Sequence, residues 1–216
     1  MSLTYNPKIF DVADEQSARR IILTTEGGVG TDERWAKETP YLADLICEQL
    51  ALQPGQVVLD YGCGIGRMAK ALIERVGCHV LGVDISTDMR GLAPGHVSSA
   101  LFSVVSRRMF EGLVAKGLRV DAAISVWVLQ HCLTPSEDIA LIRSGLGASG
   151  KVLVINNNGR AVPTVEQSWA DDRLDIRQCL AAQFVEQETG QLEARHVGQL
   201  IAQHAFWATY SQHPTP

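Results

Sequence analysis

The sequence predicts an α/β protein with a doubly wound, mostly parallel sheet and helices on both faces. From residue 56 onward, short apolar runs alternate with stretches whose apolar residues recur at helical spacing, which is typical of parallel strands joined by crossover helices. The apolar runs are nearly continuous, as expected of strands buried on both faces. The 216 residues are enough for a single domain with one large core.

The strands and helices of this region follow a regular order. Apolar residues at helical spacing predict helices over residues 65–76 and 110–117. Thr134 and Glu137 form a T-x-x-E capping box with Pro135 at the first helical position, so a further helix is expected to begin there and run to about residue 146. The expected parallel strands are residues 56–61, 79–84, 100–105, 121–128 and 151–156.

The segment before these strands predicts one helix and an arm. Thr39 followed by Pro40 indicates a helix start, and the apolar face of that helix runs through residues 41–50. Residues 1–38 are expected to form an N-terminal arm or lid, because the first ~35 are mostly polar and glycines interrupt them at 26–30.

The segment after these strands has a weaker pattern. Helices are expected over residues 171–184 and 192–204. Residues 205–211 predict a closing strand, whereas residues 184–189 fit a strand pattern poorly. A short antiparallel C-terminal edge is therefore expected.

Composition excludes several classes of protein. The net charge of -5 and pI of about 5.7 show no electrostatic footprint for nucleic acid or anionic lipid. The longest apolar runs, at residues 126–129 and 151–155, are far shorter than a membrane span. The first ten residues lack the pattern of a signal peptide. The five cysteines contain no C-x-x-C pair, which favours neither a zinc site nor a disulfide framework. We expect a cytoplasmic protein with a small or neutral partner.

The most informative segment places Gly62, Gly64 and Gly66 directly between a predicted strand and a predicted helix. No Gly-Lys-Ser or Gly-Lys-Thr occurs in the chain, which excludes a nucleoside triphosphatase loop. A dinucleotide loop needs a small residue where Arg67 lies, and no Tyr-x-x-x-Lys pair of a short-chain reductase is present. The remaining pattern is D-x-G-x-G-x-G, beginning at Asp60.

This pattern resembles motif I of the class I S-adenosylmethionine-dependent methyltransferases, whose fold is Rossmann-like. A carboxylate beside the loop suits a ligand that carries an ammonium and a sulfonium and no pyrophosphate. Residues 82–86 resemble the family's second motif, in which an acidic residue ends the second strand. Residues 121–131 resemble motif IV and the turn that follows it. Residues 147–155 are similar to the family's glycine turn into strand five. Together the segments cover about residues 40–156 in the family's order.

The resemblance implies S-adenosylmethionine as cofactor and S-adenosylhomocysteine as product. Asp84 would accept both ribose hydroxyls and Ile85 would pack on adenine, while Ser86 also fits the N-cap of the next helix. The family often has an acid after strand three that meets the adenine amino group, and here Ser106 or Ser103 would take its place. The expected cofactor-binding residues are Asp60, Gly62, Gly64, Gly66, Asp84, Ile85, Ser106, Ser125 and Trp127.

The acceptor side is expected at the turn after strand four, facing the glycine loop where the strand order reverses. His131 is the best-placed general acid or base, and a structural hydrogen bond is the alternative role. Trp35, Asn157 and Arg160 are the candidate acceptor contacts; core packing, turn formation and solvated surface charge are their alternatives.

The sequence thus predicts a methyltransferase acting on oxygen or nitrogen of a small molecule, as a monomer or homodimer. The turn after strand four lacks [ND]-P-P-[FYW], which disfavours adenine and glutamine amine methylases. The ends of strands four and five lack the acids of metal-dependent catechol-type enzymes, so no metal is expected.

Residues 1–38 would be the arm, 39–156 the cofactor-binding core and 157–216 the acceptor-side segment of one domain. A non-catalytic S-adenosylmethionine-binding module or, less favoured, a nicotinamide-dependent reductase are the alternatives.

Overall fold

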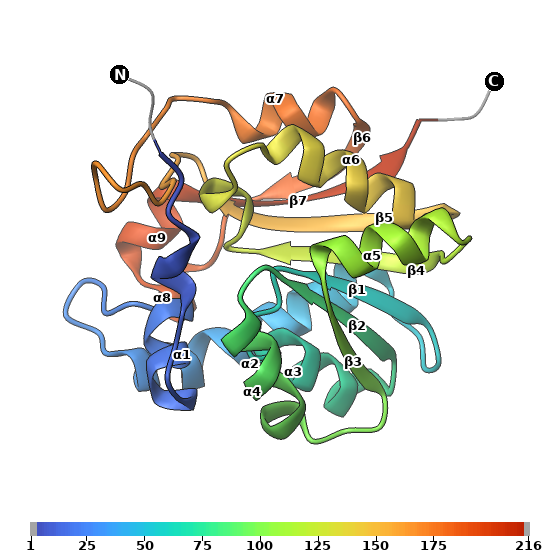
Figure 1. Ribbon diagram of the computed structural model, residues 1–216, viewed down its shortest axis with the longest axis horizontal. Helices are drawn as coiled ribbons and strands as arrows, with labels where there is room; N and C mark the ends of the chain where they lie inside the picture. Colours follow the sequence, from blue (N-terminus) through green and yellow to red (C-terminus); the bar gives the residue numbers. More distant parts are fainter. Residues whose placement is uncertain (1–3, 214–216) are drawn as a thin grey trace.

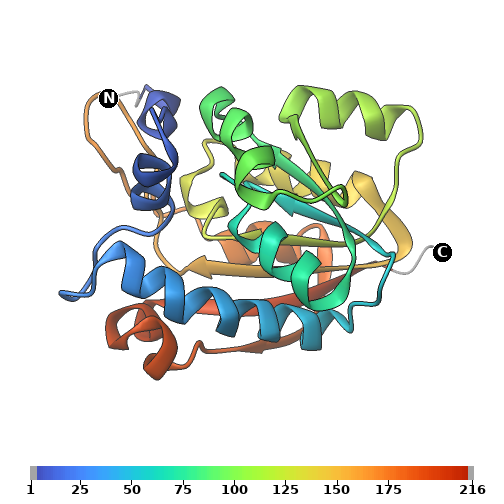
Figure 2. The same cartoon turned by 90° about the horizontal axis from the view of Figure 1, so that it is seen from below.

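The computed structural model describes residues 4–213 and shows a central sheet with helices on both faces (Figures 1 and 2). The strand order is β3-β2-β1-β4-β5-β7-β6. Strands β1 to β5 are parallel, whereas β7 pairs antiparallel with β5 and β6. The predicted doubly wound α/β class is confirmed, and the order reverses between β1 and β4. The strands are β1 (Val57–Tyr61), β2 (His79–Asp84), β3 (Phe102–Ser106), β4 (Val120–Val126), β5 (Leu146–Asn157), β6 (Phe184–Gly190) and β7 (Ala205–Gln212).

Two apolar clusters, one on each face of the sheet, hold the helices in place. Neighbouring residues of β1 show the principle: Val58 packs into one cluster and Leu59 into the other, and both are fully buried. This is why the strands have continuous apolar sequences. No described helix is long and apolar enough to cross a membrane. One face carries α2 (Thr31–Leu50), α3 (Arg67–Val76), α4 (Thr87–Val97), α8 (Ala194–Val197) and α9 (Gln199–His204); the other carries α5 (Arg107–Ala115), α6 (Pro135–Gly145) and α7 (Ile176–Ala181).

The N-terminal arm, residues 4–30, lies at the end of the sheet where the parallel strands finish (Figure 1). It contains the 3-10 helix η1 (Pro7–Phe10) and helix α1 (Glu15–Ile22), whose Ala18 packs with Ile65 and Met89. Its first residues run beside the loop after β5: Asn6 N–H donates to the Pro163 carbonyl at 2.9 Å. The arm therefore contacts segments far away in the sequence.

Helix α2 begins at Thr31, so the prediction that it starts after Thr39 is wrong. Pro40 lies inside the helix. A Thr-Pro pair resembles a helix start locally because proline lacks the N–H that the first turn leaves unpaired. The upstream turns are held by side-chain pairs instead: Arg34 Nε donates to Glu38 Oε1 at 2.6 Å, and Lys37 pairs with Glu33.

The C-terminal segment contains less helix than predicted. Helix α7 has six residues, not the fourteen expected over 171–184, because Asp175 caps it only at Ile176. The expected helix over 192–204 is divided into α8 and α9 at Gly198, whose φ is +87°.

Strand β6 is a full strand, although its sequence fits a strand pattern poorly. It is the edge of the sheet, and six of its seven residues pair with β7, while the side chains from Glu186 to Thr189 are exposed. An exposed edge strand needs no apolar alternation, so its sequence carries little signal. The expected closing strand is confirmed as β7.

Candidate active site

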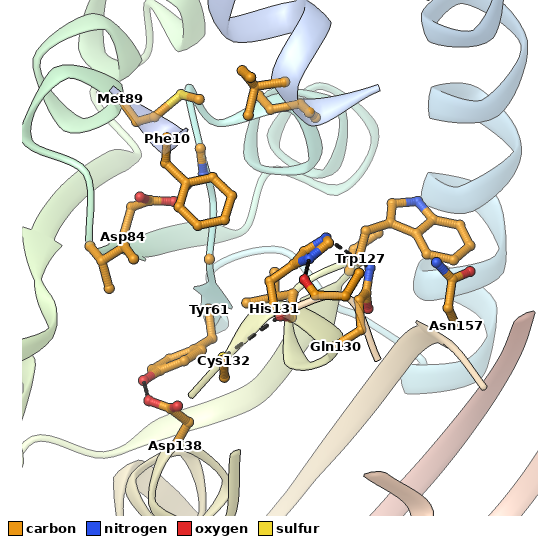
Figure 3. Close-up of a pocket in the computed structure, with 18 of the residues that line it drawn as sticks. Phe10, Tyr61, Asp84, Met89, Trp127, Gln130, His131, Cys132, Asp138 and Asn157 are labelled. Atoms are coloured by element: carbon orange, nitrogen blue, oxygen red, sulfur yellow. Dashed lines mark hydrogen bonds between the residues drawn. The ribbon is translucent and has the colours of Figure 1, made fainter. Parts of the chain in front are cut away.

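A cavity of about 520 Å³ lies at the carboxyl ends of β1, β2 and β4, beneath the N-terminal arm (Figure 3). This is the point where the strand order reverses, the usual ligand site of doubly wound sheets. Within residues 4–213, no three His, Cys, Asp or Glu side chains gather as a potential metal site. Lining residues include Tyr5, Phe10, Ile22, Arg34, Gly62, Gly64, Asp84, Ile85, Arg107, Trp127, Gln130, His131, Asn157 and Trp169.

The glycine loop after β1 requires glycine for two reasons. Gly62, Gly64 and Gly66 have φ values of +81°, +54° and +83°, which other residues rarely adopt. A Cβ at Gly62 would lie 2.3 Å from Val128 Cγ2, and one at Gly66 would lie 2.4 Å from Val97 Cγ2. Gly62 and Gly64 line the cavity, whereas Gly66 allows close packing of α3 and α4.

Asp84, at the end of β2, connects the glycine loop to the next helix. Its Oδ2 accepts a hydrogen bond from Gly64 N at 2.8 Å, and its Oδ1 accepts one from Ser86 N at 2.9 Å. Burial raises the pKa of this carboxyl group. Ile85 is 48% exposed beside it and forms an apolar wall of the cavity. Ser86 caps α4 through Met89 N.

Asp60 lies beneath the glycine loop and outside the cavity lining. It is 3% exposed, and no hydrogen-bond partner of its Oδ2 is found in the described part of the chain. Burial raises its pKa to about 7, against the opposing charge of Arg67. Arg67 is itself buried, and burial lowers its pKa to about 10. Trp35 also lies outside the lining, where it packs against Arg19 and Arg67.

At the end of β3, Arg107 lines the cavity, and neither of the predicted serines does. Ser106 accepts a hydrogen bond from Met109 N as the cap of α5 and does not line the cavity, and Ser103 is exposed on β3. Arg107 does line the cavity, and its Nε donates to Asp138 Oδ1 at 2.9 Å. Tyr61 donates to the same oxygen at 2.5 Å. Sequence reasoning missed this group because its members lie on three different elements.

The turn after β4 faces the glycine loop, as expected, and brings His131 to the cavity wall. His131 belongs to the 3-10 helix η2 (Leu129–His131), and its Nδ1 lies 2.7 Å from the Ala161 carbonyl oxygen. Burial lowers its pKa. Trp127 lines the cavity with φ at +62°, which ends β4 two residues earlier than predicted. Ser125 is buried within β4 and does not line the cavity.

Asn157, the last residue of β5, and Arg160 are the acceptor contacts predicted in this region, and only Asn157 lines the cavity. Arg160 is buried in the wall behind it, where its Nη1 donates to the Leu129 carbonyl at 2.7 Å and its Nη2 to the Cys132 carbonyl at 2.7 Å. Its Nε pairs with Asp172 at 3.0 Å. Arg160 thus holds the loop after β5 against η2.

The other cavity residues that sequence reasoning missed come from segments without a motif. Tyr5 and Phe10 belong to the N-terminal arm, Arg34 to α2, and Trp169 to the loop after β5. Their place at the site depends on contacts between distant segments.

Comparison with known proteins agrees with this geometry. The family model described as "Methyltransferase domain" matches residues 58–150. The solved structure of magnesium protoporphyrin IX methyltransferase from Synechocystis PCC 6803, with bound S-adenosylhomocysteine, aligns with a TM-score of 0.62 over 90% of this chain and 92% of that one, at 19% identity. Residues 58–150 are thus similar to a methyltransferase domain, and the chain shares the fold of these enzymes.

Curated relatives of this methyltransferase domain differ in how much they share with it. An uncharacterized methyltransferase of Geobacillus kaustophilus is 26% identical over 78% of this chain and 77% of that protein. Phosphoethanolamine N-methyltransferase 1 of Zea mays is 52% identical over 19% of this chain, and the chain spans only 8% of its length. These matches locate the domain; the reaction it supports is argued from the cavity.

Proposed function

We propose that the chain transfers a methyl group from S-adenosylmethionine to an oxygen or nitrogen atom of a small molecule. The observation that carries this proposal is the continuity of one cavity from the glycine loop and Asp84 to Gln130 and His131. A cofactor on the first side and an acceptor on the second would meet inside the protein. The volume of about 520 Å³ lies within the range of small-molecule sites.

The cofactor side of the cavity fits S-adenosylmethionine. Asp84 uses one lone pair of each oxygen on Gly64 and Ser86, and the remaining lone pairs suit the two ribose hydroxyls. The exposed face of Ile85 suits a purine ring. A Cβ at Gly62 would clash with Val128 and one at Gly64 with Ile22, so only glycine fits in this part of the wall.

Arg34 suits the carboxylate of the cofactor. Arg34 lines the cavity, and the Thr24 carbonyl and the Glu38 carboxylate hold its guanidinium in place, each at 2.6 Å. No bond of its Nη2 is found among the described residues, so two N–H groups remain for a ligand.

The chain's own residues would align the reactants and take up the proton. Bound S-adenosylmethionine supplies a methyl group on a positively charged sulfur. Positioning of the acceptor in line with it contributes roughly 7–11 kcal/mol to such displacements. The acceptor lone pair forms the new bond, and the C–S electron pair stays on sulfur. His131 is neutral at pH 7, because burial lowers its pKa, and its Nε2 would take up the acceptor proton.

Calorimetry with variants of the cofactor side tests the proposal. Asp84→Asn removes the charge that holds the ribose, so we expect S-adenosylmethionine to bind at least about 30-fold more weakly. Gly64→Val forces a β-branched residue to φ +54° and should abolish binding. Circular dichroism should show that both variants keep the fold. Asp32→Asn, whose side chain is 87% exposed, is the matched control and should bind normally.

Turnover separates an enzyme from a binding module. With methyl-labelled S-adenosylmethionine and a pool of small metabolites, we expect the label in a small-molecule product. Unchanged cofactor affinity in Asp84→Asn, or tight binding of a nicotinamide cofactor instead, would contradict the proposal. Label in nucleic acid would contradict the small-molecule acceptor.

A further inference from the structure

Gln130 holds a buried carbonyl oxygen without a partner in the cavity wall. The residue is 2% exposed, and its Oε1 is shielded from water and has no hydrogen-bond partner within residues 4–213. Its backbone N–H is fixed by Asn156 Oδ1 at 3.2 Å. An unpaired buried amide oxygen costs roughly 1–3 kcal/mol. Such a group is expected where a ligand supplies the missing donor.

The hydrogen bonds of His131 fix which end of the Gln130 amide is unpaired. The Ala161 carbonyl can only accept, so His131 Nδ1 carries the proton. In the neutral ring, Nε2 then has a lone pair and accepts from Gln130 Nε2 at 3.3 Å (Figure 3). If the oxygen and nitrogen of the amide were exchanged, Oε1 would face the lone pair of His131 Nε2, and two acceptors would repel each other. The free group at the wall is therefore the acceptor oxygen.

Two further features of the cavity lining near Gln130 suit a bound ligand. Trp127 is held at φ +62°, and its Nε1 is a second buried polar atom without a partner in the described chain. Beside His131, the rings of Phe10 and Trp169 lie 6.1 and 5.1 Å from the imidazole, and Trp169 remains 43% exposed. These rings offer flat apolar surfaces at the same part of the cavity.

On the basis of the proposed function, we propose that Gln130 Oε1 accepts a hydrogen bond from the O–H or N–H group that becomes methylated. The acceptor is an aromatic molecule whose ring lies against Phe10 and Trp169. Gln130 is then a catalytic residue that orients the nucleophile, and His131 Nε2 receives the proton when the 3.3 Å hydrogen bond from Gln130 Nε2 to its lone pair breaks. An acceptor without a donor hydrogen leaves Oε1 unpaired and binds more weakly.

Matched pairs of probes test this assignment. With the protein saturated in S-adenosylhomocysteine, thermal shifts are measured with millimolar catechol against 1,2-dimethoxybenzene and with indole against 1-methylindole. We expect the donor-bearing member of at least one pair to raise the Tm more than its methylated partner. Gln130→Met should abolish that difference, and Gln199→Met, the same change at an exposed position, should keep it.

The stability of the unliganded variant separates a catalytic from a structural role. Gln130→Met removes an unpaired buried oxygen and also the 3.3 Å hydrogen bond to His131, two opposing effects, so its Tm without ligand should stay close to that of the natural protein. A large fall in Tm, equal shifts within every pair, no shift with any probe, or unchanged discrimination in Gln130→Met would each overturn the proposal. If S-adenosylhomocysteine still binds in those cases, the proposed function stands; if it does not bind, the proposed function fails first.

Discussion

Asp60 and Arg67 show how single residues support the glycine loop without touching the cavity. Asp60 belongs to the motif that identified the loop, yet it lies below the backbone, where burial raises its pKa to about 7. Arg67 occupies the position where a dinucleotide-binding loop has a small residue. Its positive charge partly opposes the rise in the pKa of Asp60. Both residues therefore act on the stability of the loop.

Asp60→Asn should change stability in a pH-dependent way. The pKa of Asp60 is about 7 in the folded protein and 3.8 in the unfolded chain. Below pH 4 the residue is protonated in both states. Between pH 4 and 7 the unfolded chain loses this proton more readily than the folded protein, so the free energy of unfolding falls as the pH rises. Asparagine stays neutral. The free energy of unfolding of the variant, relative to that of the natural protein, should therefore increase from pH 4 to pH 8 by up to about 4 kcal/mol. Urea denaturation at several pH values measures the difference.

The control for this prediction is Asp32→Asn, which should show no such trend. Affinity for S-adenosylmethionine should change less than about threefold in Asp60→Asn, because the residue does not line the cavity. A stability difference that stays constant from pH 4 to 8 would mean that Asp60 remains charged opposite Arg67.

At the scale of elements, α2 shows how tertiary contacts extend a helix through a proline. Pro40 is exposed and removes one backbone hydrogen bond from the helix interior. Arg34 compensates by joining the upstream turns to Glu38 and to the Thr24 carbonyl of the arm. The upstream half of α2 therefore depends on contacts outside the helix.

Pro40→Ala should stabilise the protein by roughly 1–2 kcal/mol, because the restored hydrogen bond outweighs the added freedom of the unfolded chain. The midpoint of urea unfolding measures this, and Glu48→Ala, at an exposed position on the same helix, should change it by less than about 0.5 kcal/mol. A less stable Pro40→Ala variant would show that the helix needs the proline at this point.

At the scale of the whole molecule, the N-terminal arm and the loop after β5 together close the cavity. Tyr5 pairs with Thr164 across the two segments, and Phe10 lies 6.4 Å from Trp169. Helix α1 holds the arm on α4 through Ala18 and Met89. This part of the cavity thus combines residues of the N-terminal arm with residues of the loop after β5.

Deletion of residues 1–10 should open the cavity without unfolding the protein. None of the residues of η1 is buried, so cooperative unfolding should persist in differential scanning calorimetry. Loss of Tyr5 and Phe10 removes part of the cover over the cofactor, and we expect S-adenosylmethionine to dissociate about tenfold faster or more in stopped-flow displacement. An unchanged dissociation rate would show that the cofactor enters and leaves by another side.

Local patterns in the sequence determined the α/β fold, the parallel strands, the glycine loop and the acid that ends β2. Each depends on features readable within a few residues: continuous apolar runs for strands buried on both faces, and glycines where φ is positive. Gly62 and Gly66 illustrate this, since their conformation and their lack of a side chain are both local requirements.

Contacts between distant segments decided the rest, and no local pattern records them. The start of α2 depends on Arg34 reaching the arm, the exposed strand β6 depends on pairing with β7, and Arg107 enters the site because Asp138 holds it there. The roles proposed for Gln130 and Trp169 depend on the same cause: only the packed chain brings the turn after β4, the arm and the loop after β5 to one cavity.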